Sequence, residues 1–158
     1  MNCNKHKLGF SILELLVVVA VILIITAVAL PSLLRSKMSA NEASAVGSLR
    51  AIDISCINYS TTWSTGFPVS LSNLGPGRPA TSSAADLIDA LLASGTKSGY
   101  TFTYVSGSPT AGKITTYTVQ ANPQASNIGG ARHFFTDQTN VIRYSLGSIA
   151  TVSSRPLP

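Results

Sequence analysis

The sequence has few charged residues, cysteines and histidines, and these shortages exclude several kinds of protein. Only 11% of its 158 residues are charged, well below the roughly 25% of ordinary soluble domains. Cys3 and His6 lie within the first nine residues, which we interpret below as a removable leader. The remaining Cys56 and His133 cannot supply a zinc cage, an internal disulfide or a Cys/His nucleophile. We therefore expect no cofactor, and we expect Cys56 to be a small buried hydrophobe.

Positive charge is in excess but is not clustered. The formal net charge is +5, and Lys5 and Lys7 supply two of these charges within the first nine residues. Removal of those residues leaves nine basic and six acidic side chains. The nine are scattered along the chain, which indicates a solvated surface and not a nucleic-acid groove.

The hydrophobic residues are concentrated in one block, Leu15 to Leu34, which has no formal charge. As a helix, this block is long enough to cross the roughly 30 Å hydrocarbon core of a bilayer. Three interpretations fit it. It is a plain transmembrane anchor, or a secretory signal peptide removed after Ala29, or a segment whose basic leader is cut off before the block begins.

Glu14 separates these interpretations. A carboxylate near the start of an apolar helix costs up to about 2–3 kcal/mol in lipid, and neither an anchor nor a signal peptide needs it. One explanation is that Glu14 stays at the wet interface and favours the positive end of the helix dipole. The other is that it awaits a cationic partner that processing creates, and this favours the third interpretation.

The segment Gly9-Phe10-Ser11-Ile12-Leu13-Glu14, followed by apolar residues to Pro31, resembles the N-terminus of type IV pilins and of type II secretion pseudopilins. Gly, an aromatic residue, Glu and a later Pro stand at the family's offsets. Ser11 and Leu23 depart mildly from its pattern, where Thr and Gly are commoner.

The resemblance implies that a prepilin peptidase cuts after Gly9 and methylates the new N-terminus, Phe10. The amine of Phe10 would be mostly cationic at neutral pH and could neutralise Glu14 of a neighbouring subunit. Within one chain the two residues are also i,i+4 neighbours, so an internal pair is the alternative. The implied partners are further copies in a filament, the peptidase, an inner-membrane platform with its ATPase, an outer-membrane secretin, and lipid before assembly. The precursor would cross the inner membrane once with a cytoplasmic N-terminus, and the product would be extracellular or periplasmic.

The helix is expected to continue well beyond the apolar block. Ala45, Leu49, Ile52, Cys56, Tyr59 and Trp63 are spaced by three or four residues, which predicts one buried face. Ser44, Arg50, Asp53 and Asn58 lie opposite it and are expected to face solvent. A helix from Phe10 to about Thr62 would be about 80 Å long, and Pro31 should kink or locally melt it.

We therefore predict four segments: a leader (1–9), a membrane or filament-core helix (10–34), an amphipathic helical half (35–63) and a globular part (64–158). In the last, Gly66 to Ala80 is a loop, and Ser83 to Asp86 opens a short helix over Leu87–Leu92. Strands are predicted over Tyr100–Val105, Ile114–Ala121, Arg132–Thr136 and Val141–Leu146, the last two forming a hairpin around Asp137 to Asn140. Three or four antiparallel strands beside a long helix make an α+β fold.

No active site is predicted. His133 is expected to be structural. Asp137 and Asn140 are weak calcium ligands at most, because calcium wants six to eight oxygens and one acid is at hand. The chain is thus expected to be no enzyme but a pilus subunit used in adhesion, motility or DNA uptake. The alternatives are a pseudopilin and a secreted soluble protein that begins at Leu30.

Overall fold

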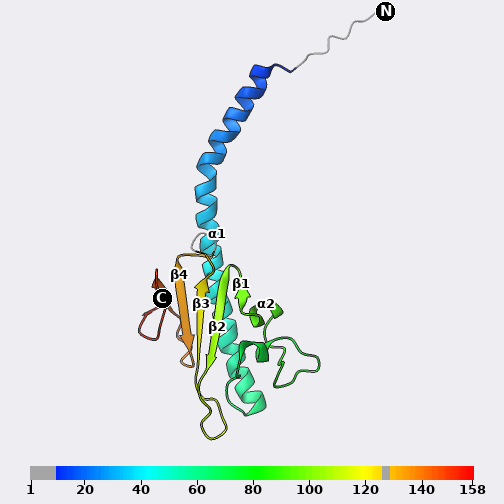
Figure 1. Ribbon diagram of the computed structural model, residues 1–158, viewed down its shortest axis with the longest axis vertical. Coiled ribbons are helices and arrows are strands. Elements are labelled where there is room, and N and C mark those ends of the chain that lie inside the picture. Colours follow the sequence, from blue (N-terminus) through cyan, green and yellow to red (C-terminus); the bar gives the residue numbers. More distant parts are fainter. Residues whose placement is uncertain (1–9, 126–128) are drawn as a thin grey trace, which may run out of the picture. The chain divides into compact units, whose positions relative to one another are not determined.

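The computed structural model describes residues 10–125 and 129–158, so the predicted leader lies outside the described residues. The chain divides into two compact units, Met1–Ser36 and Lys37–Pro158. We refer to the second unit as the head, and helix α1 (Ile12–Trp63) contributes to both units (Figure 1).

Helix α1 matches the predicted helix closely. The carbonyl of Ser11 accepts from the N–H groups of Glu14 and Leu15, at 3.1 and 3.2 Å, which closes the first turn. Helical structure continues without interruption through Pro31. The kink at Pro31 stays a prediction.

The head packs the second half of α1 against a six-stranded antiparallel sheet, which confirms the α+β fold. Its strands follow one another in chain order: β1 (Thr96–Lys97), β2 (Tyr100–Ser106), β3 (Tyr117–Pro123), β4 (Arg132–Asp137), β5 (Arg143–Leu146) and β6 (Arg155–Pro156). A 3-10 helix, η1 (Leu71–Leu74), and a short helix, α2 (Ala90–Ala93), precede them.

The predicted apolar stripe of α1 is the helical side of the core. Ala45, Leu49, Ile52 and Cys56 are fully buried, and Tyr59 is 4% exposed. They meet the side chains that alternate inward from the sheet, which are Tyr100, Phe102, Tyr117, Val119, Ala121 and Phe134. Helical residues spaced by three or four and strand residues spaced by two therefore pack together in one core.

Two strand predictions need correction at their first residues. The strand predicted from Ile114 begins at Tyr117, because Ile114 instead exchanges hydrogen bonds with Thr65 and Phe67 beyond the end of α1. The strand predicted from Val141 begins at Arg143, because the hairpin turn takes up the preceding residues. The predicted hairpin itself is confirmed as β4–β5.

The short helix predicted over Leu87–Leu92 is wrong in its bounds. It is α2, Ala90–Ala93, and its N-cap is Asp89, whose carboxylate accepts from the Leu92 N–H at 3.0 Å. Leu87 and Ile88 both donate their N–H groups to the Leu74 carbonyl. Because these hydrogen bonds go to η1, Leu87 and Ile88 are not part of α2.

Glu42 fastens α1 to the sheet. Its side chain, in the buried class, accepts from the N–H groups of Ala131 and Arg132 and pairs with the Arg132 guanidinium at 2.7 Å. A Cβ on Gly130 would lie 2.5 Å from the Glu42 side chain, so only glycine lets the backbone approach this closely.

We expect Glu42→Ala to destabilise the head by about 2–3 kcal/mol, because it leaves the N–H groups of Ala131 and Arg132 and the half-covered Arg132 guanidinium without their acceptor. Glu42→Gln should cost less, since one acceptor oxygen remains. Lys97→Ala, which breaks the more exposed Lys97–Asp89 pair, should cost at most about 1 kcal/mol. Urea unfolding of the full chain in detergent, followed by the fluorescence of the sole tryptophan, Trp63, measures all three. Equal losses for Glu42→Ala and Lys97→Ala would contradict this role.

Candidate functional site

Phe10 and Ser11 precede the first turn of α1, and Phe10 is 83% exposed. Gly9 lies outside the described residues. The carbonyl of Ser11 is engaged by the first turn of α1, whereas Phe10 lies outside the helix.

Glu14 lies in the first turn of α1 and is the one acidic residue between Phe10 and Leu34. In the given sequence Phe10 is joined to Gly9 by a peptide bond and has no free amine. A Phe10–Glu14 ion pair could therefore form only if the chain were cut between Gly9 and Phe10.

The apolar segment that follows has no cover within the described chain. Its large side chains are all exposed, from 46% at Val19 to 76% at Val28. A window of α1 has a mean hydropathy of 3.1, so the helix is long and apolar enough to cross a membrane. Exposure of this much contiguous apolar surface to water is costly, and the segment requires lipid or other chains around it.

The turn that suggested calcium uses its oxygens internally. Asp137 Oδ1 accepts from the N–H and the hydroxyl of Thr139, at 2.9 and 2.5 Å. Asn140 Oδ1 accepts from the hydroxyl of Tyr117 at 3.2 Å. Within the described ranges no three His, Cys, Asp or Glu side chains gather as metal ligands. These bonds close the β4–β5 turn, and we do not propose a metal there.

The surroundings of His133 and Cys56 indicate structural roles. His133 Nδ1 lies 2.8 Å from Asn122 Oδ1 on the adjacent strand β3. Cys56 is a free cysteine with no exposed surface. Burial raises the pKa of its thiol to about 12, so the nucleophilic thiolate is scarce at neutral pH. The buried position predicted for Cys56 is confirmed.

Asp53 was predicted to face solvent, and this prediction is wrong. It is 4% exposed and lies between α1 and the sheet. Its carboxylate accepts from the Tyr117 hydroxyl and the Thr136 hydroxyl, both at 2.9 Å. Desolvation, assisted by the nearby Asp137, outweighs these hydrogen bonds and raises the pKa of Asp53 to about 6.

Glu42 and Asp53 are the polar positions that the sequence analysis did not recognise. A signal existed for Glu42, because it precedes Ala45 by three residues and so continues the apolar stripe backwards. Asp53 follows Leu49 by four residues and precedes Cys56 by three, at the margin of the same stripe. The hydroxyl donors of Asp53 come from β3 and β4, more than sixty residues away, and helical spacing carries no information about them.

Comparison with known families supports the processing segment. Residues 4–30 match the family model described as the prokaryotic N-terminal methylation motif. The match spans Gly9, Phe10 and Glu14 and ends just before Pro31. Curated proteins and solved structures gave no match to the chain.

Because the pKa of Asp53 is raised in the folded head, its contribution to stability is greatest below its ordinary pKa of 3.8 and is lost as pH rises through about 6. Asp53→Asn should remove that dependence and make the head ~2–3 kcal/mol more stable than the unchanged protein at pH 7. Urea unfolding between about pH 4 and pH 7 measures the free energy of unfolding and its pH dependence. Asp86→Asn, which replaces an exposed acid, is the control. A less stable Asp53→Asn head at pH 7 would show that the ionised carboxylate stabilises the fold.

Proposed function

We propose that this chain, whose residues 4–30 carry the prepilin-type signal of type IV pilins and pseudopilins, is a structural subunit of a type IV pilus-like filament. The observation that carries the proposal is the apolar first half of α1, which has no cover among the described residues and begins with a single acid. Such a helix is stable in lipid as a precursor and among copies of itself as a polymer.

Processing would create the cation that Glu14 lacks. Cleavage after Gly9 frees the amine of Phe10, and methylation leaves that amine able to carry a positive charge. In an apolar bundle an unpaired carboxylate is costly, and pairing with the amine of a neighbour removes much of that cost. Only certain axial offsets between two helices bring Glu14 to Phe10, so the pair also sets the step between subunits.

Transfer from lipid to the bundle requires the helix to leave a bilayer and repack. Pro31 has no backbone N–H, so one hydrogen bond of α1 is missing there. We assign to it the bend that this transfer needs. The machinery would be that of the family: prepilin peptidase, an inner-membrane platform with an ATPase, and an outer-membrane secretin.

The same membrane chemistry serves a pseudopilin, which forms a short periplasmic filament for protein secretion. Major pseudopilins of the family bind calcium in a C-terminal loop. Near Asp137 the described chain offers one further carboxylate, that of Asp53, whose oxygens already accept from two hydroxyls, and this poor supply of calcium ligands favours the pilus. Electron microscopy distinguishes the two: a pilus subunit gives surface filaments that disappear when the subunit is deleted, whereas a pseudopilin gives none under native expression.

We expect the mature protein to begin with N-methyl-Phe10, as measured by mass spectrometry of its N-terminal peptide. Gly9→Val should leave the full-length precursor in the membrane, because a β-branched side chain obstructs close approach of the backbone to the peptidase. Ser11→Thr, which keeps the cleavage residues and restores the commoner residue of the family, is the control and should be processed normally. A product that begins at Leu30 would instead identify a secreted soluble protein and overturn the proposal.

A further inference from the structure

The two sides of α1 within the head present different surfaces. One side faces α2 and β1, and the other faces the C-terminal strands (Figure 1). At 100° per residue the positions of Ser44 and Ser48 point to the first side, and those of Val46 and Arg50 point to the second. We call the side of α1 that faces α2 and β1 the α2 flank, and the side that faces the C-terminal strands the β5 flank.

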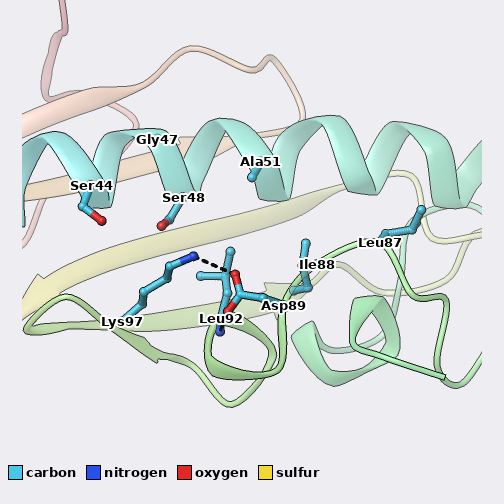
Figure 2. A pocket seen from close by; sticks show the side chains of 9 residues that line it. All are labelled: Ser44, Gly47, Ser48, Ala51, Leu87, Ile88, Asp89, Leu92 and Lys97. Carbon is cyan, nitrogen blue, oxygen red and sulfur yellow. Dashed lines mark hydrogen bonds and ion pairs between the residues drawn. The ribbon is translucent and has the colours of Figure 1, made fainter.

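The α2 flank is hollow. A cavity of about 430 Å³, open to solvent, lies between α1 and the segment that leads into α2. Figure 2 shows the side chains that line it. Its helical wall consists of small residues, and its opposite wall carries Leu87, Ile88 and Leu92. Asp89 and Lys97 also line it and are paired with each other at 2.6 Å. Beside that pair and two serines, the cavity thus offers an apolar patch of Leu87, Ile88 and Leu92, with space for an aliphatic side chain.

Asp86 directly precedes Leu87 of this cavity and is exposed. The ion pairs among the described residues are Lys97–Asp89 and Arg132–Glu42. Asp86 belongs to neither, and Arg78, the nearest cation along the chain, forms no ion pair with it. Of the other acids of the head, Asp89 is exposed but paired with Lys97, and Glu42, Asp53 and Asp137 are buried.

The β5 flank projects aliphatic side chains and Arg50, beside the ion-paired Arg132. Ile54 is 60% exposed, Ile57 42% and Val141 37%. Arg50 is exposed among them and takes part in neither of the two ion pairs. Arg50 lines three adjoining hollows, which it shares with Ile54 and Ile57, with Asn140 and Val141, and with Leu157. It is the only charged side chain on the exposed face of α1 between Ala40 and Trp63.

From this complementarity we propose that the β5 flank of one head docks on the α2 flank of a second copy, with Arg50 paired to Asp86 across the contact. Ile54 and Ile57 supply aliphatic side chains, and the second copy supplies the apolar cavity. The contact joins two different surfaces, so it does not close after two copies and continues from copy to copy as a helical array. The inference rests on the proposed filament, which places copies side by side.

Charge exchange tests this contact in cells that produce the full chain. Arg50→Glu alone, and Asp86→Lys alone, should each lower the amount of sheared filament per cell at least about tenfold, because each places like charges together. The double variant Arg50→Glu/Asp86→Lys should restore filaments to within about threefold of the unchanged chain. Lys113→Glu reverses an exposed cation on the β2–β3 connection and should have no effect.

Asp86 has a φ of 55°, a backbone conformation that asparagine tolerates and lysine disfavours. Asp86→Asn therefore tests loss of the charge without strain and should also reduce filaments. Mass spectrometry of each variant must show N-methyl-Phe10, so that lost filaments cannot reflect lost processing. Normal filaments from Arg50→Glu, or failure of the double variant to recover while both singles are impaired, would overturn the docking alone. Absence of filaments from the processed, unchanged chain would overturn the proposed function together with it.

Discussion

The structure depends on one requirement: an apolar helical surface that the described chain leaves bare has to be covered. In the proposed filament, the carboxylate at the start of that surface has to be neutralised as well. From Ile12 to Leu34 every large side chain of α1 is exposed, and Glu14 is the only acid among them. Lipid satisfies the first need but penalises Glu14. In the filament that we propose, a bundle of identical helices satisfies both needs once the amine of Phe10 is free, because that amine would stand near the acid of another copy. Proteolysis would thereby change which environment the helix prefers.

The head treats most of its acids in the opposite way, since Glu42, Asp53 and Asp137 are buried. Glu42 meets two backbone N–H groups and a guanidinium, and Asp53 meets two hydroxyls. Each bond joins α1 to the sheet, so buried polar groups fix the helix in one position where apolar contacts alone would tolerate sliding. Because Glu42, Asp53 and Asp137 are buried, little negative charge remains outside. Arg50 and Asp86 are left as exposed charges without internal partners, on opposite flanks.

Much of the fold followed from periodicity. The stripe from Ala45 to Tyr59 predicted the buried face of α1, and the turn at Asp137 to Asn140 predicted the β4–β5 hairpin. The errors arose where a residue far away in the sequence determines the local structure. Leu87 and Ile88 are hydrogen-bonded to Leu74 and so are not part of the predicted helix. Ile114 is hydrogen-bonded to Thr65 and Phe67 and so is not part of β3. Asp53 is buried because β3 and β4 bring it hydroxyls. The processing segment was predictable in full as a pattern, because its chemistry resides in consecutive residues, whereas neither flank of α1 was visible before the sheet had been placed.

The most direct test of the account is the yield and axial repeat of filaments formed by Glu14→Leu subunits, measured by electron microscopy after N-methylation of Phe10 has been verified. Leucine makes the segment more apolar, so an assembly driven by burial alone should proceed at least as well as before. If pairing with Phe10 sets the step between subunits, these filaments should be scarce or should lose their regular repeat. Filaments of unchanged yield and repeat would contradict the central role of the Glu14–Phe10 pair.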